Sequence, residues 1–196
     1  MQTIKLLSSV AAVAIISGCA HPILISPDIS KIERSSDAQP IRKNVGYYIP
    51  PEIREKEVTT PGGGGDKVSY RPYKDIEMAY YKMLGNVFQS ATLLPAPNDM
   101  DTIGKREISY IFTLDITTDS SSPSPFTWPP TKFTVNLTSN INDAAGTPVT
   151  SISVTGEGQA EFDEFKSDLS LSGKRAAQDA ILKTQDKLLG LPELRN

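Results

Sequence analysis

The feature that most limits what this chain can fold into is its only cysteine, Cys19, at the end of an apolar run. One basic residue, Lys5, precedes the run from Leu6 to Ile16, and two small residues separate the run from the cysteine. A basic start, a short apolar stretch and small residues at a cleavage point are the three parts of a secretory signal. We therefore predict that residues 1–18 are removed, and that the rest folds without an intrachain disulfide.

The residues Ile16-Ser17-Gly18-Cys19 resemble the lipobox of bacterial lipoproteins. That resemblance implies cleavage before Cys19 and acylation of its thiol. An ordinary signal peptide and an uncleaved span are the alternatives, although the apolar run is about half of the ~20 residues that a span needs. Ala20 and His21 follow the cysteine, where an aspartate would resemble an inner-membrane retention signal. The resemblance therefore implies an outer-membrane anchor with the protein facing the periplasm.

Composition excludes several chemistries. Cleavage leaves 178 of the 196 residues, enough for one domain, and changes the net charge from −3 to −4 by removing Lys5. This mild acidity gives no electrostatic basis for binding nucleic acid. The only histidine, His21, lies two residues from Cys19, so a Ser-His-Asp triad within the domain is excluded. We predict no catalytic residues, no metal and no cofactor.

The order of predicted elements indicates an α+β fold. Residues 19–43 read as a tether that joins the lipid to a single domain over residues 44–196. Within it, residues 21–27 are apolar with two prolines and are expected to be extended and partly docked, whereas residues 31–43 are polar and aperiodic. Alternating apolar residues predict strands over 45–49, 108–117, 133–141 and 149–162, with a possible short strand at 68–70. Apolar spacings of three and four predict helices over 75–91 and 172–189. The result is an antiparallel sheet of about four strands with two helices on one face, in the order β(β)-α-β-β-β-α. Gly156 and Gly158 suggest a bulge or bend in the last strand.

Two groups of residues invite a catalytic interpretation and have simpler alternatives. The acidic cluster Glu157, Glu161, Asp163 and Glu164 could supply paired carboxylates for a hydrolase, but a solvated strand end explains it as well. The run Gly62, Gly63, Gly64 and Gly65 departs from the phosphate-loop pattern, because Asp66 separates the last glycine from Lys67. A flexible loop is the prediction there.

The segment from Ser120 to Pro130 is an unusual loop, because it places the only tryptophan beside a phenylalanine and among four prolines. Proline lowers the entropic cost of presenting aromatic rings, and such rings are favoured at interfaces. We predict a partner-binding surface formed by Phe126, Trp128, Pro129 and Pro130. The alternative is that Trp128 folds back and caps the sheet.

Several segments resemble a family of uncharacterised proteobacterial outer-membrane lipoproteins: residues 45–49, 61–66, 126–131 and 143–146. More distantly, the lipobox and the element order are similar to YajG-type lipoproteins and to the lipoprotein subunit of the lipopolysaccharide translocon. No motif matches the translocon subunit position by position, so its binding residues do not carry over.

The expected function is a non-catalytic binding or assembly role in the cell envelope. Its partners would be the membrane, through the N-terminal lipid, and another envelope protein. Two alternatives stay open: a carrier for a small ligand or glycan, and a carboxylate-based envelope hydrolase.

Overall fold

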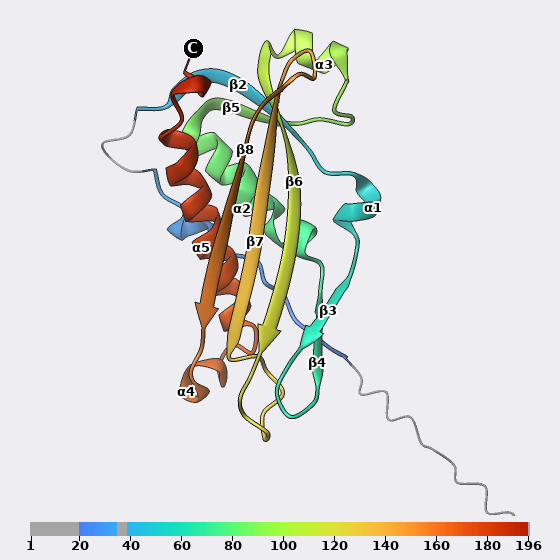
Figure 1. Cartoon of the computed structure of the whole chain (residues 1–196), viewed down its shortest axis with the longest axis vertical. Coiled ribbons are helices and arrows are strands. Elements are labelled where there is room, and N and C mark those ends of the chain that lie inside the picture. Colours follow the sequence, from blue (N-terminus) through green and yellow to red (C-terminus); the bar gives the residue numbers. More distant parts are fainter. Residues whose placement is uncertain (1–19, 35–38, 196) are drawn as a thin grey trace, which may run out of the picture.

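The computed structural model describes residues 20–34 and 39–195, so the signal segment and Cys19 lie outside the described residues. Two sheets and two long helices form the body of the fold (Figure 1). In chain order the elements are β1 (Ala20–Pro22), η1 (Ile29–Lys31), β2 (Ile41–Tyr48), α1 (Pro51–Arg54), β3 (Val58–Pro61), β4 (Lys67–Tyr70), α2 (Pro72–Val87), β5 (Phe88–Leu93), α3 (Met100–Lys105), β6 (Ile108–Ser121), β7 (Lys132–Asp143), β8 (Pro148–Gln159), α4 (Phe162–Phe165), α5 (Leu171–Leu189) and η2 (Pro192–Leu194).

The larger sheet has five strands in the order β5-β2-β6-β7-β8. Strands β6, β7 and β8 form an antiparallel meander, whereas β2 runs parallel to both β5 and β6. Parallel neighbours need a crossover connection, and α2 lies in the crossover from β2 to β5. The α+β class is therefore confirmed in outline, but the expectation of one antiparallel sheet of about four strands is wrong.

The sequence analysis did not predict strands β1, β3 and β5, and it assigned β5 to the end of the first helix. Val87, Phe88 and Ala91 have helical spacing, but α2 ends at Val87 and the chain then becomes extended. Phe88 packs edge-on against Phe112, with ring centroids 5.5 Å apart. Pairing with β2 supplies the hydrogen bonds that the helix would have made.

A second, smaller sheet has the order β1-β4-β3. Strands β3 and β4 form an antiparallel hairpin across the glycine run, and β1 lies parallel to β4, with Ala20 opposite Lys67. Residues 20–34, expected to belong to a tether, thus include a strand of the domain, and β2 begins at Ile41 rather than near Val45.

Helices α2 and α5 cover one face of the large sheet, and Figure 1 looks onto the other face of β6, β7 and β8. The covered face is apolar, as in the row formed by Ile116, Leu137 and Val154 across the three strands. The open face is polar, and there the hydroxyls of Thr138 and Ser153 lie 2.7 Å apart. The half-buried alternation predicted for these strands is confirmed.

Gly156 and Gly158 mark the closest approach of helix α5 to strand β8. The ladder between β7 and β8 is regular at both positions, so the predicted bulge is absent there. A side-chain carbon on Gly156 would overlap the Ala176 carbonyl oxygen and lie 2.7 Å from Cβ of Ala180. On Gly158 it would overlap the carbonyl oxygen of Ser172. Both glycines are therefore required by packing.

We expect Gly156→Ala to destabilise the fold by about 1–3 kcal/mol, because the added methyl group must push α5 away from the sheet. Gly85→Ala is the matched control: it lies within α2 with no atom within 4 Å of the new carbon, and should stabilise the helix by about 0.5–1 kcal/mol. Urea unfolding of the two variants measures the difference. Equal stabilities would contradict the close packing of α5 on β8.

Candidate functional site

The glycine loop and the aromatic loop, distant in sequence, contact each other at one end of the molecule. Both lie at the lower end in Figure 1. The amide of Gly63 donates to the Trp128 carbonyl at 2.9 Å, and the amide of Gly64 donates to the Ser124 carbonyl at 3.0 Å. A side-chain carbon on Gly62 or Gly63 would overlap the backbone of the aromatic loop. The glycine run therefore packs against the aromatic loop, and its flexibility stays a prediction.

Strand β1 joins these two loops through its only aromatic ring. The imidazole of His21 stacks on the Trp128 indole, with ring centroids 4.2 Å apart and planes 19° from parallel. The Nε2 atom of His21 also lies 3.5 Å from Oδ2 of Asp66, in the glycine loop. We call residues 20–22, 62–66 and 122–131 the aromatic end.

The four residues predicted to bind a partner have different environments. Phe126 is 94% exposed, whereas Trp128 is half-buried beneath His21 and Pro129 and Pro130 are buried. The two prolines therefore pack against the domain and hold the loop in place. Partner binding by this loop stays a prediction, and Phe126 is the ring that is free to make contact.

The N-terminal segment that follows β1 packs between α2 and α5. Ile25 and Ile32 are fully buried in the core. The amide of Ile25 donates to Oδ2 of Asp75 at 3.2 Å. Burial raises the pKa of the Asp75 carboxyl, and the hydrogen bond from Ile25 partly opposes that shift.

Asn86 and Gln185 hold the far end of this segment. Asn86 donates from Nδ2 to the Ile32 carbonyl at 3.0 Å and to Oε1 of Gln185 at 2.9 Å. Gln185 donates to the Glu33 carbonyl at 2.9 Å. These bonds satisfy the side-chain amides that the docked segment buries, because buried amides without partners would be costly.

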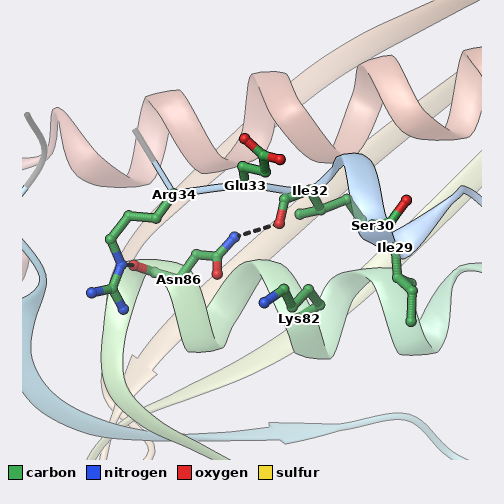
Figure 2. A pocket seen from close by; sticks show the side chains of 7 residues that line it. All are labelled: Ile29, Ser30, Ile32, Glu33, Arg34, Lys82 and Asn86. Carbon is green, nitrogen blue, oxygen red and sulfur yellow. Dashed lines mark hydrogen bonds between the residues drawn. The ribbon is translucent and has the colours of Figure 1, made fainter. Parts of the chain in front are cut away.

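A shallow hollow of about 550 Å³ lies between this segment and α2 (Figure 2). Its lining residues are Ile29, Ser30, Ile32, Glu33, Arg34, Lys82 and Asn86. Figure 2 shows Asn86 bonded to Ile32, and Arg34 donates to the Asn86 carbonyl at 2.8 Å. These polar groups hold the segment in place, so the hollow gives no specific support to the carrier alternative.

The two edges of the large sheet differ. Along the β8 edge, α5 presents a charged side chain at every fourth residue. Arg175, Lys183 and Lys187 donate to the carbonyls of Gln159, Thr155 and Ser153 at 2.7, 2.9 and 2.7 Å, and Asp179 accepts from the Glu157 amide at 2.9 Å. Four helical residues rise about 6 Å and two strand residues about 6.6 Å, so the two spacings match.

The β5 edge has no comparable cover. Among residues 20–34 and 39–195, no side chain makes a hydrogen bond to the main chain of β5. Beside this edge lies a hollow of about 540 Å³, formed by β5, α2, Tyr47 of β2 and Arg106. Its rim carries Met78, Tyr81 and Leu93, whose exposed fractions are 61%, 45% and 51%. We call β5 and these three side chains the open edge.

Three residues of the acidic cluster, Glu161, Asp163 and Glu164, have side-chain partners that explain their positions, and Glu157 bonds Asp179 through its backbone amide. Glu164 makes a two-point ion pair with Arg175, which lowers the pKa of its carboxyl to about 2, and it shares a capping box with Glu161 at the start of α4. Asp163 pairs with Lys166 at 2.7 Å. Within the described residues, acidic and histidine side chains do not gather into a group that could hold a metal, and no helix there is suited to crossing a bilayer.

Comparison with known proteins finds no matching family model and no matching curated protein. A Xanthomonas campestris protein of the DUF330 family is 11% identical, with a TM-score of 0.49 over 87% of this chain and 90% of that one. The PelC dodecamer from Paraburkholderia phytofirmans is 12% identical, with a TM-score of 0.42 over 76% and 90%. A minor lipoprotein from Acinetobacter baumannii is 9% identical, with a TM-score of 0.39 over 79% and 93%. At these values the similarities carry no conclusion about function, so the likenesses to YajG and to the translocon subunit stay predictions.

We expect Ile25→Ala to cost about 2–5 kcal/mol of folding free energy, because it leaves a cavity between α2 and α5. Its neighbour Leu24 is 54% exposed, and Leu24→Ala should change stability by less than about 0.5 kcal/mol. Chemical unfolding of the full chain compares the two. Two neutral substitutions would mean that residues 20–34 are a tether after all.

Proposed function

We propose that this protein is a lipid-anchored protein of the bacterial envelope that binds a partner protein without catalysis. The partner contributes an extended segment, which adds to the large sheet at the open edge. Cys19 carries the lipid, and the lipobox resemblance supports an outer-membrane anchor facing the periplasm. The difference between the two sheet edges carries the proposal.

An exposed edge strand presents unpaired amides and carbonyls, which invite pairing with another chain. Folded proteins usually protect such edges with charges or by covering them. The β8 edge has this protection from four side chains of α5. Beside the β5 edge lie the exposed side chains of Met78, Tyr81 and Leu93, and within the described residues no side chain bonds its main chain, which favours strand addition as its use.

The open edge supplies both parts of strand recognition. Main-chain hydrogen bonds from β5 would give affinity, and the neighbouring hollow would select a side chain. Tyr81 and Met78 on its rim favour an apolar side chain of the partner. Of the two charged residues that line the hollow, Glu77 is already paired with Arg54 at 2.6 Å, and Arg106 is the other.

A binding role is also supported by how the chain uses its acid–base side chains. The ring of His21 is stacked, and the carboxylates of Asp75 and Glu77 are held by a backbone amide and by Arg54. Glu164 is paired with Arg175. Each of these groups has an intramolecular partner that accounts for its position.

The test is photo-crosslinking in cells from two edge positions of the full-length protein. A photoreactive residue at Leu93, on the open edge, should give one specific protein adduct. The same residue at Thr155, on the covered β8 edge, should give none. Adducts from both positions, or from neither, would contradict docking at the open edge.

Leu93→Lys is the matched loss-of-binding variant, because lysine on an edge strand opposes strand addition. We expect it to reduce recovery of the partner in affinity purification by about tenfold or more. Val149→Lys places the same charge on β8 at a half-exposed valine and should leave recovery unchanged.

A further inference from the structure

We propose that the aromatic end rests on the lipid bilayer and that Phe126 inserts into its interface. This inference rests on the proposed acylation of Cys19. It assigns a lipid surface, and not a protein partner, to the aromatic loop. The observations that carry it are the fixed position of Ala20 and the exposure of the neighbouring ring.

The structure sets where the acyl chains leave the domain. Ala20 pairs with Lys67 at the start of β4, and the amide of Ile23 donates to the Ser69 carbonyl at 2.9 Å. Cys19 is the preceding residue, and consecutive Cα atoms are about 3.8 Å apart. The lipid is therefore attached within one residue of the small sheet, so the domain cannot stand far from the bilayer.

The aromatic loop lies directly beside this attachment point. His21, two residues after the acylated cysteine, stacks on Trp128, and the glycine loop is bonded to both Trp128 and Ser124. A lipid anchored next to His21 thus brings the bilayer to the aromatic end. A long free tether would have allowed any face of the domain to meet the membrane.

Phe126 is displayed in a way that suits an apolar surface. Its side chain is 94% exposed. The amide of Phe126 donates to the Ser124 hydroxyl, and the amide of Ser124 donates to the Ser122 hydroxyl. These hydrogen bonds, together with Pro123 and Pro125, fix the conformation of the loop before it meets the membrane. Exposed Phe and Trp residues are typical of segments that bind the membrane interface.

Helix α4 supplies a second contact at the same end, the lower end in Figure 1. Phe162 is 54% exposed and packs edge-on against Phe165. The ammonium group of Lys166 lies 4.6 Å from the centre of the Phe162 ring. An aromatic ring beside a lysine combines apolar burial with a charge that can face lipid headgroups.

The only tryptophan of the chain is a native reporter for this contact. Purified full-length lipidated protein is reconstituted into phosphatidylcholine vesicles with brominated acyl chains, and tryptophan emission is measured. Two single-tryptophan proteins extend the experiment: Trp128→Phe combined with Phe126→Trp, and Trp128→Phe combined with Met100→Trp. Met100 is 65% exposed in α3, at the opposite end of the molecule (Figure 1).

We expect brominated lipid to quench the tryptophan at position 126 several-fold more than the one at position 100, with unsubstituted Trp128 between them. Aqueous iodide should give the reverse order. Equal, weak lipid quenching at both positions in protein that sediments with the vesicles would overturn the inference and leave the anchor intact. Protein that fails to sediment with the vesicles would overturn the anchor and the inference together.

Discussion

The contact between helix α5 and strand β8 is the interaction on which the rest of the structure depends. Gly156 and Gly158 let the helix lie against the strand, and Ala176 and Ala180 face them with side chains small enough to fit. This closeness brings the charged side chains of α5 within hydrogen-bond distance of every second residue of β8. One helix thus buries the core and closes one edge of the sheet, which leaves β5 as the edge available for pairing.

In the proposed membrane orientation, the same helix also helps to place the bilayer relative to the domain. Gln185 of α5, with Asn86 of α2, bonds the backbone of the N-terminal segment, while Ile25 and Ile32 fill the space between the helices. The segment is therefore part of the core rather than a linker. Its docking fixes Ala20 beside the aromatic end, so a lipid on Cys19 orients the whole domain, with the open edge accessible from the side.

Local patterns predicted the meander and the last helix well, because alternation over residues 108–117 and 133–141 reports burial of one strand face. The parallel pairing of β2 was not predictable, since it depends on contacts between distant segments. The spacing of Val87, Phe88 and Ala91 fits a helix and a strand equally. Ile25 ends the short apolar run from Ile23, and Ile32 follows in a polar stretch, so the run indicated partial docking but no periodicity showed which residues are buried. Likewise, both loops of the aromatic end were recognised separately. Nothing in the sequence around His21 or Trp128 indicates that the two rings stack, because the residues are far apart in the chain.

The proposed membrane orientation depends most on the docked N-terminal segment, because that segment holds Ala20, the residue after the proposed lipid anchor, in one position. Hydrogen exchange of the full-length protein in vesicles measures its docking directly. The amides of Ile23 and Ile25, bonded to Ser69 and Asp75, should exchange as slowly as those of α2, since they open only when the domain opens. Exchange of these two amides at the rate of an unfolded chain would contradict the docked segment and the membrane orientation derived from it.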